Sequence, residues 1–184
     1  MTIDLTCSPI IAAVKSEDQL ERALKTDPEV IFLLFGDILN IAALTEKVRA
    51  AGKLPVVHMD LISGLAGKEI AVDFIARTTK AAGIISTKPA LIRRARELGL
   101  FTVLRVFVID SMALASLEKE SRLSQPDVIE LLPGLMPSII REVTTKQSVP
   151  VIAGGLISDK ADIVAALKAG ALAVSTTNEK NWNA

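Results

Sequence analysis

Short apolar segments rich in β-branched residues alternate along this chain with longer amphipathic segments. Strands of this kind, apolar on both faces, are typical of a parallel sheet covered by helices. The predicted strands cover residues 9–14, 29–35, 55–61, 82–87, 100–108, 127–133, 149–155 and 171–176. Helices are expected to begin near Ser16, Asp37, Lys68, Pro89, Ser111, Pro137 and Asp159, and the final segment NEKNWNA can supply an eighth helical turn.

Eight strand–helix units without a linker or low-complexity segment predict one domain over residues 1–184. The fold class that this repeat favours is α/β, as a compact (β/α)8 barrel of the TIM type. The alternative is an open doubly wound sheet, which usually has a glycine-rich turn after its first strand. The corresponding segment here, AAVKSEDQ, contains no glycine, so the barrel is preferred.

The last two predicted strands end in residues suited to anion binding. Gly154 and Gly155 end the seventh strand, and the eighth ends in Ser175, Thr176 and Thr177. In barrels of this type, the loops after strands seven and eight often form a phosphate site. Glycines let the backbone approach the anion, and the N–H groups of the following helix face it. We therefore expect Gly154, Gly155, Ser175 and Thr176 to bind phosphate, and a tight turn with a helix N-cap remains the alternative.

Several ionisable residues lie inside the predicted strands or at their carboxyl ends, where barrels of this type have their active sites. Arg105 and Glu130 lie on adjacent strands, and an unpaired buried charge is costly, so they should face each other or a ligand. A purely structural pair is as reasonable as ligand binding. Asp60 and Lys88 can likewise pair or bind the hydroxyls of a small ligand. The candidate ligand-binding residues are Lys15, Asp60, Lys88, Arg105 and Glu130.

The sequence offers little for metal or covalent chemistry. His58 is the only histidine, so a site built on several imidazoles is excluded, and a packing or supporting role is expected for it. No cluster at metal-ligand spacing accompanies Asp60. A Schiff base on Lys15 or Lys88, or proton abstraction by Asp60, lacks a recognisable partner arrangement. We therefore expect no metal, no cofactor and no catalytic residues.

The bulk composition limits the partners. Twenty-one basic residues balance twenty-one acidic ones, so no whole-molecule field attracts a polyanion. Cys7 is the only cysteine, which excludes an internal disulfide and suits a reducing compartment. The N-terminal segment does not resemble a signal peptide, and no apolar run approaches the ~20 residues of a membrane span. A soluble cytoplasmic protein without membrane contact is expected.

Five segments together resemble one known family. The motifs DLISGL, IISTK and ELLPG, followed by IAGGLI and AVSTTN, are similar to those of the glycerol uptake operon antiterminator family, the glycerol-3-phosphate-responsive regulators. The resemblance covers nearly the whole chain. It implies a barrel that binds glycerol 3-phosphate as its effector and acts on leader mRNA in transcription antitermination. The implied ligand face comprises Lys15, Asp60, Lys88, Arg105, Glu130, Gly154, Gly155, Ser175 and Thr176.

Local charge gives one candidate RNA surface. Between Arg77 and Arg105 there are seven basic residues and one acidic residue. Arg93, Arg94 and Arg96 share a predicted helix and could contact RNA phosphates, although an ordinary solvated helix face explains them equally well. Aromatic residues make up 3% of the chain, so base stacking is disfavoured, and binding to RNA shape and backbone, for instance by a homodimer, is the preferred form.

Two other functions remain open. A phosphosugar-barrel enzyme, such as an aldolase, epimerase or decarboxylase, would use Lys88 or Asp60 as its reacting group. The second possibility is a barrel that keeps the phosphate site but has no regulatory partner, because fold does not fix function.

Overall fold

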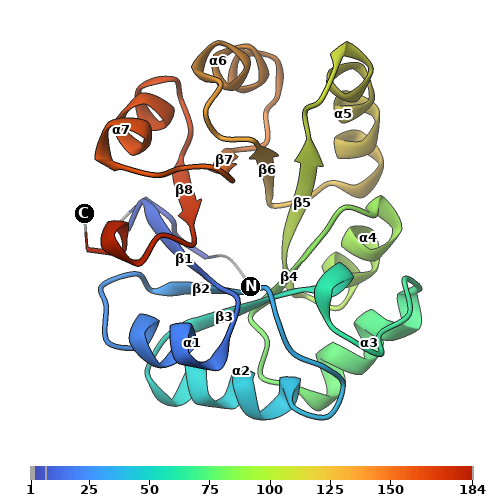
Figure 1. The fold of residues 1–184 in the computed structure, drawn as a ribbon. Coiled ribbons are helices and arrows are strands. Elements are labelled where there is room, and N and C mark those ends of the chain that lie inside the picture. The colour runs from blue at the N-terminus through green and yellow to red at the C-terminus, as the bar shows by residue number, and fades with distance from the viewer. Residues whose placement is uncertain (1–2, 7, 184) are drawn as a thin grey trace.

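The computed structural model describes residues 3–6 and 8–183, so Cys7 lies outside the described residues. Eight parallel strands form a closed barrel in chain order, in which β8 pairs with β1 and Ser175 stands opposite Ile11 (Figure 1). The predicted (β/α)8 barrel is confirmed, and the open sheet is excluded. The strands are β1 (Ile10–Val14), β2 (Val30–Leu33), β3 (Leu54–His58), β4 (Gly83–Ser86), β5 (Phe101–Phe107), β6 (Val128–Leu132), β7 (Val151–Gly154) and β8 (Ala173–Thr176).

Seven α-helices surround the barrel within the described residues, and two 3-10 turns complete the regular structure (Figure 1). The expected eighth helical turn is one of these 3-10 turns, η2, which follows β8. The helices are α1 (Glu17–Ala23), α2 (Ile41–Ala50), α3 (Glu69–Thr78), α4 (Pro89–Glu97), α5 (Ser111–Ser124), α6 (Pro137–Lys146) and α7 (Lys160–Lys168), and the 3-10 turns are η1 (Met59–Leu61) and η2 (Glu179–Asn181).

Most boundaries lie within two residues of the sequence prediction, and two differ by more. The helix expected near Asp37 begins at Ile41, because the Asp37 backbone bridges to Ser63 and its carboxylate accepts the N–H groups of Leu39 and Asn40. The third strand, expected to reach residue 61, ends at His58, and the chain then turns into η1. Both changes occur in segments that follow the carboxyl ends of strands, and at Asp37 a side chain takes the backbone N–H groups that would otherwise start the helix.

The barrel separates two apolar cores. One lies between the strands and the helices, and the other fills the barrel interior. Val103 and Val128 belong to the interior core, and side chains alternate along a strand, so Arg105 and Glu130 also point inward. The interior is thus hydrocarbon over most of its length and becomes charged at the carboxyl ends of the strands.

Candidate ligand-binding site

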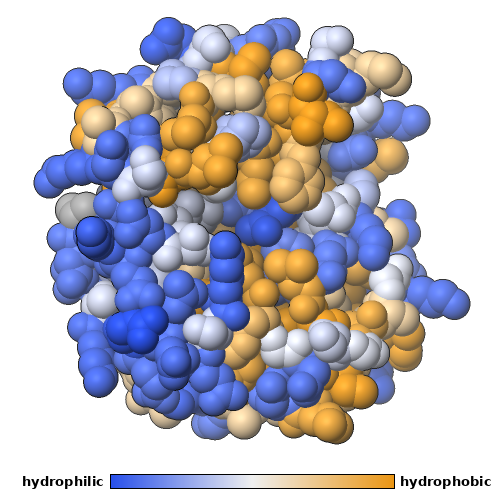
Figure 2. Space-filling view, viewed as in Figure 1, coloured by the Kyte–Doolittle hydropathy of each residue, from blue (hydrophilic) through white to orange (hydrophobic). Residues whose placement is uncertain are grey.

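A cavity of about 900 Å³ opens at the carboxyl ends of the strands. Residues at or beyond the ends of every strand except β4 line it. Figure 2 shows hydrophilic residues in a central hollow, with the larger group of hydrophobic residues above it and a smaller group below. The lining residues are Ala13, Lys15, Leu34, Leu61, Arg105, Phe107, Glu130, Leu132, Pro133, Gly155, Leu156, Ile157, Ser158, Ser175, Thr176, Thr177 and Asn178.

Arg105, Glu130 and Ser175 form a linked group inside the barrel. Arg105 and Glu130 are register partners on β5 and β6, and Arg105 Nε lies 2.6 Å from Glu130 Oε2. Ser175 Oγ donates to the other carboxylate oxygen at 2.5 Å. Glu130 is 0% exposed, so this pairing satisfies a carboxylate that is completely removed from water. Of the two alternatives left open by the sequence, that Arg105 and Glu130 face each other or a ligand, the structure shows that they face each other.

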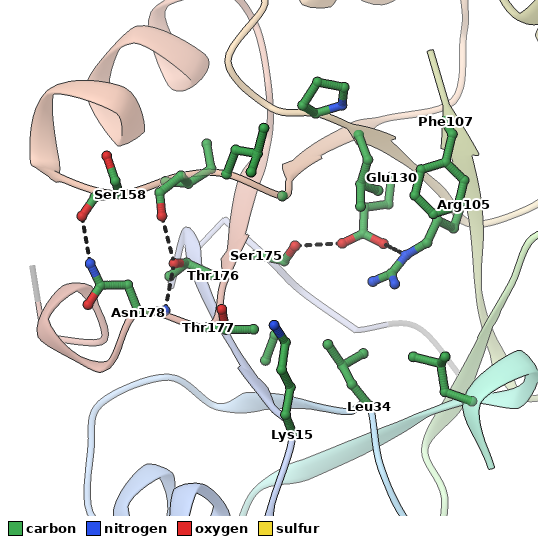
Figure 3. Close-up of a pocket in the computed structure, with 17 residues that line it drawn as sticks. Lys15, Leu34, Arg105, Phe107, Glu130, Ser158, Ser175, Thr176, Thr177 and Asn178 are labelled. Carbon is green, nitrogen blue, oxygen red and sulfur yellow. Dashed lines mark hydrogen bonds and ion pairs between the residues drawn. The ribbon is translucent and has the colours of Figure 1, made fainter. Parts of the chain in front are cut away.

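The terminal amino groups of Arg105 remain available. They make no hydrogen bond to any described residue, and Figure 3 shows them pointing into the cavity. Lys15 follows β1 directly, and its backbone N–H is held by Gln19 Oε1 at 2.8 Å. Its ammonium group has no partner in the described part of the chain and also points into the cavity (Figure 3). The cavity therefore contains two cationic groups, while its one lining carboxylate already binds Arg105.

Gly154, one of the residues expected to bind phosphate, packs closely against Ser175 and Glu130. A Cβ atom at this position would lie 2.5 Å from Ser175 Oγ and 2.6 Å from Glu130 Oε1. The absence of a side chain therefore makes room for the bond between Ser175 and Glu130, and Gly154 does not line the cavity. Gly155 does line it, with a φ of 74° that favours glycine.

The loops after β7 and β8 are tied to each other. Thr176 Oγ1 donates to the carbonyl of Ile157 at 3.2 Å, and Asn178 Nδ2 donates to the carbonyl of Ser158 at 2.6 Å. The hydroxyls of Ser175 and Thr176, both expected to bind phosphate, are thus already engaged as donors within the protein.

The start of α7 is likewise occupied by the protein's own side chains. Asp159 accepts the N–H group of Asp162, and the Asp162 carboxylate accepts those of Ser158 and Asp159. These carboxylates fill the place that an anion takes at other helix N-termini. By contrast, the backbone N–H groups of Gly155, Leu156 and Ile157 donate to no described residue and remain available at the cavity wall.

Asp60 and Lys88 also pair, but outside this cavity. Lys88 Nζ lies 3.2 Å from Asp60 Oδ1, and the other carboxylate oxygen accepts from Ser86 Oγ and the N–H group of Thr87. Burial alone would raise the pKa of Asp60, but the hydrogen bonds from Thr87, Lys88 and Ser86 outweigh it and lower the pKa. Neither Asp60 nor Lys88 lines the cavity, so the expected ligand face divides into two separate groups.

His58 lies inside the barrel, where it is 3% exposed, and its Nδ1 has no hydrogen-bond partner among the described residues. Burial, followed by the nearby charge of Arg105, lowers the pKa of His58 to about 4. The imidazole is therefore neutral at pH 7. Across residues 3–6 and 8–183, no group of three His, Cys, Asp or Glu side chains is arranged to hold a metal ion.

The three arginines expected to contact RNA all have protein partners. Arg93 lies 3.1 Å from Glu69, Arg94 lies 2.6 Å from Asp73, and Arg96 donates to the carbonyl of Gln125. Glu69 and Asp73 belong to α3, upstream of the segment whose charges appear strongly basic in the sequence. The fold therefore compensates much of that charge. No helix in the described part of the chain is long and apolar enough to span a membrane.

The apolar part of the cavity was not predicted from the sequence. Phe107 and Leu132 lie two residues beyond Arg105 and Glu130, so strand alternation could have placed them on the same wall. Leu156 has no such signal, because it lies in a loop with a positive φ of 61°. Phe107 and Leu156 line the cavity and are also exposed, and further exposed apolar side chains follow β5 and β6, namely Ile109, Met112 and Leu135.

The fold and the cavity define the class of protein: a closed (β/α)8 barrel with a cavity at the carboxyl ends of its strands, lined by Lys15 and Arg105. Residues 10–182 match the model of the family described as glycerol-3-phosphate responsive antiterminator. The chain belongs to this family.

Two solved structures with antiterminator names, and one curated relative of unassigned function, are similar to this chain. The chain is 41% identical to the uncharacterized protein YgcP of Escherichia coli over 95% of this chain and 92% of that protein. It is 33% identical to the glycerol uptake operon antiterminator regulatory protein of Listeria monocytogenes, with a TM-score of 0.95 over 99% of this chain and 98% of that one. A glycerol uptake operon antiterminator-related protein from Thermotoga maritima is also 33% identical, with a TM-score of 0.83 over 94% and 96%.

Proposed function

We propose that this protein is a glycerol-3-phosphate-responsive regulator that acts in the cytoplasm on the leader mRNA of genes of glycerol metabolism. Binding of the effector would favour the form that lets transcription continue past a terminator. Membership in the antiterminator family supports this function, and so does the name of the Listeria relative. The observation that carries the proposal is the cavity, into which the unpaired ammonium group of Lys15 and the free terminal amino groups of the Glu130-paired Arg105 point.

The chemistry of glycerol 3-phosphate matches the cavity. The ligand is a phosphate monoester with a short carbon chain and two hydroxyls. Cationic side chains and unpaired N–H groups suit the phosphate. Phe107 and Leu132 offer apolar contact to the carbon chain, as expected for a cavity that is mainly apolar with a few directed polar groups.

Thermal unfolding tests the effector. A ligand that binds only the folded state stabilises it by about 2.7 kcal/mol at a concentration one hundred times its Kd. We expect glycerol 3-phosphate to raise the Tm in a saturable way and glycerol at equal concentration to leave it unchanged. No shift at millimolar glycerol 3-phosphate would contradict the proposal.

Fluorescence gives a second reading of the same binding event. Trp182 is the only tryptophan, and its Nε1 donates to the carbonyl of the cavity-lining Thr176 at 2.9 Å. A ligand that moves the end of β8 is therefore expected to change the emission of Trp182, with the same Kd as the thermal titration.

The RNA step needs its own experiment. We expect leader RNA to bind more tightly in the presence of glycerol 3-phosphate than in its absence, and a shuffled RNA of equal length to show no such dependence. A protein that responds to the effector in the thermal titration but binds no leader RNA would be a barrel that has kept its ligand site without the regulatory partner.

The enzymatic alternative is less well supported. The reacting groups that it would use, Lys88 and Asp60, pair with each other and do not line the cavity. Trapping of a lysine adduct by borohydride in the presence of a small sugar phosphate would favour an enzyme over a regulator.

A further inference from the structure

We infer that the phosphate of the ligand is held by Arg105 and Lys15, with Glu130 as the residue that positions Arg105, and not by the hydroxyls that end β8. The inference rests on the proposed function for the identity of the effector. The subsite itself suits any phosphate monoester and inorganic phosphate.

Arg105 has the geometry that phosphate recognition requires. Its Nε is bound to Glu130 at 2.6 Å, which directs the two terminal amino groups away from the carboxylate and into the cavity (Figure 3). Paired N–H donors of a guanidinium match two oxygens of a phosphate. The side chain is 8% exposed, so little water screens its charge.

Lys15 completes the subsite from the other side of the barrel. It lies at the end of β1, and Figure 3 shows its ammonium group extending into the same cavity as the Arg105 guanidinium. A phosphate monoester carries up to two negative charges; Lys15 and Arg105 provide two positive charges against the one negative charge of Glu130, so the subsite itself has an excess of positive charge. The unpaired N–H groups of the loop after β7 can add to this subsite.

The hydroxyls at the end of β8 are poor alternatives. Ser175 Oγ donates to Glu130, and Thr176 Oγ1 donates to the carbonyl of Ile157. If Ser175 donated to a ligand instead, the buried Glu130 carboxylate would lose a hydrogen-bond donor. If Thr176 did so, the Ile157 carbonyl would lose one. Thr177 is the one residue of this group whose hydroxyl makes no hydrogen bond to a described residue. A β8 hydroxyl site would therefore depend on Thr177.

Glu130 has two opposing effects on an anion. Its negative charge repels a phosphate, whereas its bond to Arg105 Nε holds the guanidinium in the orientation that binds one. Replacement by Gln removes the charge and weakens the hold on Arg105. Charge alone thus predicts tighter phosphate binding in Glu130→Gln, and the positioning role predicts weaker binding.

The subsite is tested by titrating variants with inorganic phosphate and with glycerol 3-phosphate, using calorimetry and Trp182 emission. We expect Lys15→Met and Arg105→Lys to weaken both ligands by about tenfold or more, the range of a lost charge-assisted hydrogen bond. Lys168→Met makes the same change of net charge at the end of α7, and should leave both Kd values unchanged.

Thr177→Val decides between the two placements of the phosphate. We expect it to change the Kd less than Lys15→Met does. A larger loss in Thr177→Val than in Lys15→Met overturns the inference, and so does wild-type affinity in Lys15→Met. If the wild-type protein itself binds inorganic phosphate but not glycerol 3-phosphate, the proposed effector fails while this subsite is retained.

The positioning role of Glu130 is tested by whether Glu130→Gln raises or lowers the Kd for phosphate. Weaker phosphate binding in folded Glu130→Gln supports the role, and unchanged or tighter binding overturns it. If Glu130→Gln does not fold, Ser175→Ala takes its place, because it loosens the same carboxylate without changing its charge. We expect Ser175→Ala to weaken phosphate binding, and wild-type affinity in that variant overturns the role.

Discussion

At the scale of single residues, the buried His58 makes the stability of the fold depend on pH. Its imidazole is buried beside the Arg105 charge, and burial followed by that charge lowers its pKa to about 4. The nearby Asp60 acts in the opposite direction without overcoming either effect. The folded protein therefore excludes a proton that the unfolded chain accepts at an ordinary histidine pKa of about 6.5.

This difference predicts a defined loss of stability in acid. Above pH 6.5 His58 is neutral in both states and contributes nothing, and between pH 6.5 and 4 only the unfolded state takes up its proton. We expect the free energy of unfolding to fall by about 3 kcal/mol across this window, as measured by urea denaturation at several pH values.

His58→Gln provides the control, because it should remove this part of the pH dependence and leave the steeper loss at lower pH. That later loss belongs to carboxylates whose pKa values are lowered by folding, namely Asp60, Asp73, Asp162 and Glu179. As the only histidine, His58 gives a single imidazole titration by NMR, and a folded-state pKa near 6.5 would contradict the prediction.

Some residues could be assigned from the sequence and others could not. The cost of isolated charge in two apolar strands predicted that Arg105 and Glu130 face each other or a ligand, and the structure shows the pair. Gly154 was ambiguous, because a glycine that admits a ligand and a glycine that makes room for Ser175 and Glu130 look identical in a sequence. Only the neighbouring strands distinguish the two.

At the scale of secondary structure elements, α3 and α4 show why a local charge count misleads. The segment from Arg77 to Arg105 is basic in the sequence, but α3 brings Glu69 and Asp73 against the arginines of α4. Arg94 bonds to Asp73 of α3 at 2.6 Å and to Glu97 of its own helix at 2.9 Å, so its bond to Asp73 links α4 to α3. Arg93 is 57% exposed, and an exposed ion pair of this kind is weak enough for a phosphate to replace it.

This arrangement refines the prediction for RNA. We expect the double variant Arg93→Ala and Arg96→Ala to weaken leader RNA binding and to reduce the slope of log K against log salt by about 1.4, about 0.7 for each lost phosphate contact. Arg94 is left intact, because its loss would disturb the packing of α3 on α4. Filter binding at several salt concentrations measures the slope. An unchanged affinity would show that the RNA interface does not include Arg93 and Arg96 of α4.

The order of the elements was more predictable than their ends. Apolar runs and helical periodicity identified all eight strands and seven helices, because both follow from burial alone. The errors at Asp37 and at Met59–Leu61 fall where side-chain hydrogen bonds or a 3-10 turn continue from a strand, and these depend on contacts that a sequence pattern does not contain.

At the scale of the whole molecule, charge balance limits how RNA can be recognised. Equal numbers of basic and acidic residues give no long-range attraction to a polyanion, so binding must arise from a local surface. The cavity wall at the end of β8 leads directly into η2. Glu179 of η2 pairs with Arg22 of the outer helix α1 at 2.5 Å. A ligand that shifts the end of β8 therefore acts on a segment that also contacts an outer helix.

If the effector and the RNA bind different surfaces of one barrel, their coupling must be reciprocal. The factor by which glycerol 3-phosphate tightens leader RNA binding has to equal the factor by which the RNA tightens glycerol 3-phosphate binding, and couplings of this kind are typically about 5- to 150-fold. We expect equal factors from RNA titrations with and without effector and from effector titrations with and without RNA. Lys15→Met should lower effector affinity without changing RNA affinity in the absence of effector, because Lys15 faces the cavity. A factor of one in both directions would show that the two sites are independent, and the barrel would then not be an effector-dependent antiterminator.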